Sequence, residues 1–274
     1  MPKKIGIFDS GLGGLTVLRA LEDKIPAGIQ LIYLGDTARV PYGSKSPSTI
    51  RKYALQAARF FSEMGVDTMV IACHSASAVA VEVIRELFPR MRVLGVIEPG
   101  VQVALDIVEK IADAQPVIGV ISTRGTHRSE AYANAIRSRN PEVQVISQPC
   151  PLFVPLVEEG WAGTEVAAQV AGQYLAPFRL RRVQALILGC THYPIMYDDI
   201  RQQLPETVQL IDSAEPTANE ICADLHVCGP QLPTLFFVTD VSDRFAELAG
   251  RFLGRTVDQI SCVDLELEVV SGSR

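Results

Sequence analysis

Residues 66–75 read VDTMVIACHS, and residues 183–192 read VQALILGCTH. The two stretches align without a gap, and in each an apolar run ends at a cysteine, Cys73 or Cys190. A short apolar run bounded by turn-forming residues is typical of a buried strand in a parallel sheet. Because both cysteines occupy the same place, the sequence predicts that one strand-and-turn arrangement occurs twice.

Two further stretches match upstream of the cysteines. Residues 5–10 read IGIFDS and residues 118–123 read IGVIST, so each is a short apolar run that ends in small polar residues. Similar segments in similar order indicate two half-sized units of the same layout. The alternative is that strand, turn and helix recur in any α/β protein without duplication. Of the two, the sequence favours a pseudo-twofold organisation.

Apolar runs alternate with segments of helical periodicity along the whole chain. The runs are at 5–8, 30–34, 68–72, 92–97, 117–121, 143–146, 185–188, 208–211 and 235–238. Helical periodicity follows each of the two cysteines and stops at Pro89 and at Pro205. This alternation predicts an α/β fold, with two similar three-layer domains built on mainly parallel sheets.

Turn-forming residues after two strands suggest where the chain crosses between the domains. We expect a first domain formed by residues 1–98 and 212–274, which carries Cys73, and a second formed by residues 99–211, which carries Cys190. Ligands of open α/β sheets bind beyond the carboxyl ends of the strands. The active site is therefore expected in the cleft between the domains.

Composition narrows the class of protein. A chain of 274 residues that is 48% hydrophobic can bury a large core, which excludes a disordered protein. The formal charge of −6 and the absence of a long basic run argue against a nucleic-acid partner. No apolar stretch is long enough to span a membrane, and no signal peptide is visible, so we expect a cytoplasmic protein. A small polar substrate fits these properties best.

The loop at residues 9–14, DSGLGG, follows the first strand. It lacks the third glycine of a dinucleotide-binding loop, but its backbone N–H groups could approach a bound carboxylate. Asp9 would then accept a proton or pair with an ammonium group, and Ser10 would donate a hydrogen bond. The alternative is that Asp9 or Ser10 simply caps the following helix.

A second loop, at residues 35–43, reads GDTARVPYG and follows the second strand. Its proline and glycines fix an unusual backbone path, so it could form the wall of a pocket. The alternative is a surface turn that buries Tyr42, and the sequence by itself favours this alternative.

The two matched cysteines are candidates for chemistry, although a free cysteine is more often a small buried hydrophobic residue. A thiol at the start of a helix is near the positive end of the helix dipole, which predicts a pKa below about 8.5. Asp9 and His192 could then hold or transfer the proton of each sulfur. No metal site is expected, because Cys222, His226 and Cys228 do not complete a four-ligand set.

Racemisation of an amino acid is a reaction that needs two similar acid/base groups. One group removes the proton from one face of Cα while the other returns a proton to the opposite face. Two sulfurs that flank the carbon would be separated by roughly 6 to 8 Å. Ser75 and Thr191 are placed to donate hydrogen bonds to the α-carboxylate. A cysteine-dependent hydrolase is the alternative, but it leaves the second cysteine without a role.

Pyridoxal phosphate is the usual cofactor for this reaction and requires a Schiff-base lysine. Lys45 is the only lysine in a candidate site loop. We therefore expect chemistry without a cofactor.

The motifs together resemble the glutamate racemase family. They are residues 8–14, Gly35-Asp36 with 41–43, Cys73 before Ser75-Ala76, 155–158, 189–194, 211–213 and 236–240. The resemblance spans nearly the whole chain. It implies a cofactor-independent interconversion of L- and D-glutamate that supplies D-glutamate to peptidoglycan, and we expect a homodimer. A racemase of aspartate or another amino acid is the close alternative.

The resemblance also implies roles for individual residues. Cys73 and Cys190 would be the two acid/base residues, Asp9 would assist Cys73, and His192 with Glu158 would assist Cys190. The implied substrate contacts are Asp9, Ser10, Tyr42, Gly43, His74, Ser75, Thr191 and His192.

One departure from the family concerns the residues after the first cysteine, where Asn-Thr is usual and this chain has His74-Ser75. Serine keeps the hydroxyl donor. Histidine can still donate a hydrogen bond, but it is bulkier and can become charged near neutral pH. We expect His74 to contribute through a ring N–H or its backbone and to leave glutamate as the substrate.

Overall fold

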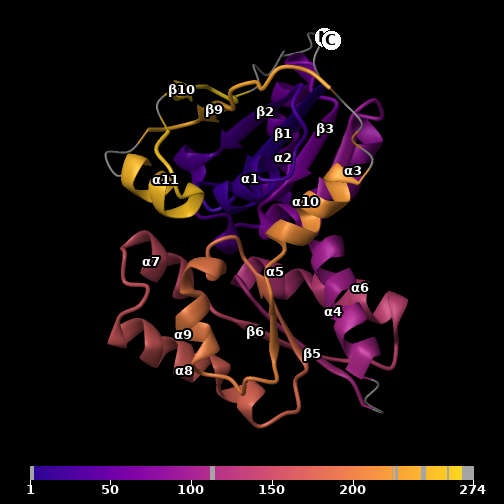
Figure 1. Ribbon diagram of the computed structural model, residues 1–274, viewed down its shortest axis with the longest axis vertical. Coiled ribbons are helices and arrows are strands. Elements are labelled where there is room, and N and C mark those ends of the chain that lie inside the picture. Colours follow the sequence, from indigo (N-terminus) through magenta and orange to yellow (C-terminus); the bar gives the residue numbers. More distant parts are fainter. Residues whose placement is uncertain are drawn as a thin grey trace, which may run out of the picture.

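Two parallel sheets with flanking helices make up the protein, as a computed structural model shows (Figure 1). The structure describes residues 3–111, 115–223, 225, 228–241, 245–257 and 259–266, so the predicted motif residue His226 lies outside it. The predicted α/β fold with two mainly parallel sheets is confirmed. No helix in the described ranges has the length and apolar character needed to cross a bilayer.

The first sheet has the strand order β10-β9-β2-β1-β3-β4. Its strands are β1 (Lys3–Asp9), β2 (Ile29–Gly35), β3 (Thr68–Ile71), β4 (Arg92–Gly95), β9 (Leu235–Val238) and β10 (Ser261–Cys262). The helices beside it are α1 (Leu15–Glu22), α2 (Pro47–Glu63), α3 (His74–Leu87), α10 (Ala214–Cys222) and α11 (Phe245–Leu253). Figure 1 shows the C-terminal elements, in orange and yellow, returning to the body that contains β1.

The second sheet has the strand order β6-β5-β7-β8. Its strands are β5 (Val117–Ser122), β6 (Gln144–Pro149), β7 (Ala185–Gly189) and β8 (Gln209–Ile211). The helices beside it are α4 (Ile97–Ile111), α5 (Arg124–Ser129), α6 (Ala131–Arg139), α7 (Phe153–Glu158), α8 (Glu165–Arg179) and α9 (Tyr197–Arg201). Short 3-10 helices occupy Thr37–Arg39, Tyr42–Ser44 and Tyr193–Met196.

Four strands of each sheet follow the same order. The order β2-β1-β3-β4 in the first sheet corresponds to β6-β5-β7-β8 in the second, and every described strand pair is parallel. In the first sheet the amide of Ala72 donates to the carbonyl of Phe8, and in the second Ser122 pairs with Gly189. Both cysteines therefore follow the strand next to the central one, as the matched stretches predicted.

All nine predicted apolar runs lie on strands, whereas the two-residue edge strand β10 was not predicted. The predicted domain boundaries remain a prediction. The first falls within the opening turn of α4, and the second falls between β8 and α10. Helix α4 contacts β7, and α10 contacts α1.

A glycine at the same position in β1 and β5 lets an aromatic ring pack on each central strand. A Cβ added at Gly6 would lie 2.8 Å from the ring of Phe61, at the end of α2. One added at Gly119 would lie 2.9 Å from the ring of Phe178, at the end of α8. The strand-and-helix packing of the two units is thus equivalent at this position.

We expect Gly119→Ala to destabilise the protein by about 1–3 kcal/mol, because the new methyl group would overlap Phe178 in a close-packed core. Denaturant unfolding measures the effect. Gly250→Ala is the control, since a Cβ there, on α11, would come no closer than 4.0 Å to a neighbouring atom. Equal stability of the two variants would contradict this account of the packing.

Candidate active site

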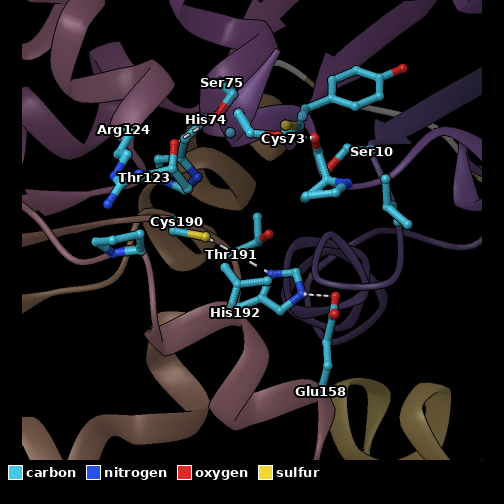
Figure 2. A pocket seen from close by; sticks show the side chains of 18 of the residues that line it. Ser10, Cys73, His74, Ser75, Thr123, Arg124, Glu158, Cys190, Thr191 and His192 are labelled. Carbon is cyan, nitrogen blue, oxygen red and sulfur yellow. Dashed lines mark hydrogen bonds and ion pairs between the residues drawn. The ribbon is translucent and has the colours of Figure 1, made fainter. Parts of the chain in front are cut away.

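A cavity of about 240 Å³ lies where strands of both sheets end. Figure 2 shows side chains from both units directed toward it. The first unit contributes Ser10, Gly11, Val40, Pro41, Tyr42, Gly43, Ser44, Cys73, His74 and Ser75, and the second contributes Thr123, Arg124, Pro151, Val154, Pro155, Glu158, Cys190, Thr191 and His192. Every predicted site residue except Asp9 is among them.

The two matched cysteines reach this cavity from different sheets. Cys73 is the N-cap of α3, and Cys190 directly follows β7. Both are buried free thiols, and Figure 2 shows them within one cluster of side chains. The two sulfurs are also electrostatically coupled, because charge on Cys190 raises the pKa of Cys73. The predicted separation of the sulfurs, and their roles, stay predictions.

The expectation that the helix start lowers the pKa of both thiols is wrong for Cys73. Burial, followed by the negative charge of Asp9, raises the pKa of Cys73 to about 12, although Ser10 donates a hydrogen bond that opposes this rise. The desolvation of a buried thiolate therefore outweighs the dipole of α3. Cys73 is therefore a protonated thiol at neutral pH.

Cys190 is adjacent to a positively charged partner. The Nδ1 atom of His192 lies 3.9 Å from the sulfur, and Nε2 lies 3.1 Å from Oε1 of Glu158 (Figure 2). Burial by itself would lower the pKa of His192, but the hydrogen bonds and charges of Cys190 and Glu158 raise it to about 10. His192 is therefore an imidazolium at neutral pH, and it can stabilise a thiolate beside it.

Asp9 lies behind the cavity lining rather than in it. Its side chain is buried, and Oδ2 accepts a hydrogen bond of 2.9 Å from the amide of Gly11. Burial raises the pKa of Asp9, and the positive charge of His192 partly offsets that rise. The alternative role as a helix cap is wrong, because the N-cap of α1 is Gly14 and no side chain caps it.

The loop after β2 forms part of the cavity wall. The sequence favoured a surface turn at this loop, and that prediction is wrong. Tyr42 is buried, as that reading expected, yet Tyr42 and Gly43 both line the cavity. The Tyr42 hydroxyl donates to Asp36, which also pairs with Arg39 at 2.8 Å. This buried network fixes the loop against the site.

His74 is enclosed at the side of the cavity. Its ring stacks on Tyr132 with the centroids 6.2 Å apart, and neither ring nitrogen has a hydrogen-bond partner in the part of the chain that the structure describes. Burial lowers the pKa of His74 to about 3, so the ring is neutral at physiological pH. A buried N–H without a partner is costly, and a bound ligand could satisfy it.

Three hydroxyl groups form a triangle beside His74. The Oγ of Ser75 lies 3.0 Å from Oγ1 of Thr123 and 3.1 Å from Oγ1 of Thr126, and the two threonine oxygens are 3.1 Å apart. The sequence pattern predicted Ser75 as a site residue but neither of the two threonines. Thr123 has the same place in its unit as Ser10 has in the other, so the match between residues 5–10 and 118–123 could have predicted it.

Two glycines of the first unit let it approach the second closely. A Cβ at Gly13 would collide with Oγ1 of Thr191 and lie 2.6 Å from Nδ1 of His192. A Cβ at Gly43 would lie 2.7 Å from Cβ of Thr123. The loops of one sheet are thus in direct contact with the site residues of the other.

The described residues contain no group of three or more histidine, cysteine or acidic side chains that could hold a metal ion. Lys45 is not among the residues that line the cavity.

Comparison with known proteins identifies the family. The family described as Asp/Glu/Hydantoin racemase matches residues 13–221, which is most of the chain. The protein belongs to this racemase family. The racemase is 45% identical to the glutamate racemase of Geobacter metallireducens over 273 residues, which cover 97% of this chain and 98% of that protein.

Solved structures agree with this assignment. The glutamate racemase of Francisella tularensis, in complex with D-glutamate, superposes with a TM-score of 0.88 at 36% identity, covering 97% of this chain and 98% of that one. The glutamate racemase of Thermus thermophilus, in complex with beta-chloro-D-alanine, gives a TM-score of 0.83 at 38% identity, covering 96% and 98%. The likeness therefore includes both sheets of the racemase.

The lowered pKa of His74 predicts that the folded protein loses stability in acid. Between pH 6.5 and about 3 the unfolded chain protonates this histidine while the folded protein leaves it neutral, so the free energy of unfolding falls as the pH falls. By pH 5 the loss is about 2 kcal/mol relative to pH 7. Urea unfolding of His74→Asn should show a correspondingly smaller loss.

The control is His127→Asn, which changes a half-buried histidine on α5 that hydrogen-bonds to Ser147. Wild type and this control should lose more stability than His74→Asn over the same pH range. Parallel curves for wild type and His74→Asn would refute the burial argument.

Proposed function

We propose that this protein interconverts L- and D-glutamate by a two-thiol mechanism that uses no cofactor. The single observation that carries the proposal is that two buried thiols, one from each sheet, line one cavity. The full-length relatives named above are glutamate racemases, which supports glutamate as the substrate.

The two thiols have different surroundings, and each serves as the base for one enantiomer and as the acid for the other. When Cys190 acts as the base, with Cys73 protonated and the His192 imidazolium beside it, the Cys190 sulfur takes the Cα proton and the electrons of the broken C–H bond stay on the α-carbon. Cys73 then delivers its proton to the opposite face of that carbon. For the other enantiomer the two sulfurs exchange these roles.

The residues behind the sulfurs assist them. Asp9, with its raised pKa, accepts the proton of the Cys73 thiol when Cys73 must act as the base, or pairs with the substrate ammonium group. Glu158 keeps His192 charged, so that His192 stabilises the Cys190 thiolate. Each pairing gives a sulfur a neighbouring group that can hold a proton or stabilise the charge that remains when the sulfur loses one.

Hydrogen-bond donors around the cavity hold the substrate. The hydroxyl groups of Ser75, Thr123 and Thr191 and the neutral ring of His74 are placed to donate to its carboxylates. Such donors stabilise the charge that develops as the Cα proton leaves. His74 thereby takes the position of the asparagine that is usual in the family without adding charge to the site.

The cellular role follows from the family resemblance. We propose that the enzyme acts in the cytoplasm, supplies D-glutamate for peptidoglycan and works as a homodimer.

The test incubates the purified protein with each glutamate enantiomer in heavy water, without added cofactor, and follows optical rotation and deuterium at Cα. Cys73→Ser and Cys190→Ser should each lower the rate in both directions by at least about 10²-fold, because each sulfur is needed in both. Cys262→Ser, on the exposed edge strand β10, should retain activity.

Two outcomes would contradict the proposal. Retained activity in Cys190→Ser but not in Cys73→Ser would indicate a hydrolase with a single nucleophile. Faster turnover of aspartate than of glutamate in a parallel assay would indicate a racemase with another substrate.

A further inference from the structure

Arg124 is the only lysine or arginine among the residues that line the cavity. It begins α5, directly after Thr123 of the hydroxyl triangle, and its side chain is exposed at the cavity margin (Figure 2). Within the described ranges its guanidinium group has no hydrogen bond or ion pair, although its charge lowers the pKa of nearby Tyr174 against the effect of burial. It is a cation at the site that is available to a ligand.

The other charged groups of the site are already engaged. His192 is held between Cys190 and Glu158, and Asp9 is buried behind the lining. Glu158 itself adds negative charge to the cavity wall. A substrate that brings two carboxylates into this cavity therefore meets hydroxyl donors deep in the site and one unpaired cation at its margin.

The chemistry of glutamate assigns the two carboxylates to different places. Its α-carboxylate is bonded to the carbon that must lie between Cys73 and Cys190, so that carboxylate lies deep, near the hydroxyl triangle. The side-chain carboxylate extends away from that carbon. A guanidinium group suits it, because its planar fork of N–H donors matches the two carboxylate oxygens.

We propose, resting on the function given above, that Arg124 binds the side-chain carboxylate of the substrate at the margin of the cavity and selects dicarboxylates. Because Arg124 is exposed, water and salt screen the contact, and its contribution is moderate. It acts on binding and capture of the substrate, and the proton transfers at Cα do not pass through it.

The first experiment measures kcat and KM of Arg124→Gln for both enantiomers at low and high salt. We expect KM to rise roughly 10-fold while kcat changes less than about 2-fold, and the salt dependence of kcat/KM to flatten. Arg124→Lys should recover part of the loss. Arg128→Gln is the matched control, since Arg128 is exposed on the same helix but does not line this cavity.

The second experiment tests which carboxylate is bound by comparing the binding of D-glutamate with that of D-glutamine, in which only the side-chain carboxylate is replaced by an amide. Wild type should bind D-glutamate more tightly than D-glutamine, and Arg124→Gln should reduce that preference by about 10-fold. An unchanged preference, or an unchanged KM, would overturn the role of Arg124. Failure of the wild type to racemise glutamate would instead overturn the proposed function, so the two failures are distinguishable.

Discussion

The site depends on a steric constraint, which is the direct contact between loops at the carboxyl ends of two separate sheets. Neither sheet carries a complete set of groups, because Cys73 follows β3 and Cys190 follows β7. The distance between the sulfurs is set by how closely the units approach. Gly13 and Gly43 have no Cβ at the positions where the second unit contacts the first. Interiors are packed too densely for a larger side chain to be absorbed there without displacement.

The enclosure that this contact creates also controls the charges. Desolvation on burial dominates the pKa of the Cys73, Asp9 and His74 side chains. His192 is the exception, because two partners hold its charge and outweigh the cost of burial. Electrostatic interactions in such a site are stronger than in water. The scaffold is nearly symmetric, but one thiol faces a carboxylate and the other faces an imidazolium.

Much of this architecture was predictable because buried strands and helices give regular patterns of apolar residues in the sequence. Strands buried on both faces give continuous apolar runs, so the nine main strands and the pairing of the two units followed from the residue pattern. The segment after Cys190 was harder. Its apolar stripe predicts one helix, but the structure has a 3-10 helix at Tyr193–Met196 and then α9, which ends at Arg201. The two-residue strand β10 is too short to leave a pattern.

The properties that sequence reasoning missed arise from tertiary contacts. The raised pKa of Cys73 comes from burial and from Asp9, 64 residues earlier (73 − 9), whereas local sequence shows only the start of a helix. Thr126 and Arg124 belong to no apolar period, and only the fold brings them beside Ser75 and the cavity.

The unequal surroundings of the two sulfurs have a thermodynamic consequence. Mirror-image forms of an amino acid have the same free energy in water, so the Haldane relation makes the catalytic efficiencies of the two directions identical. The asymmetry between the imidazolium side and the carboxylate side can therefore make kcat and KM differ between the two enantiomers, but only by the same factor.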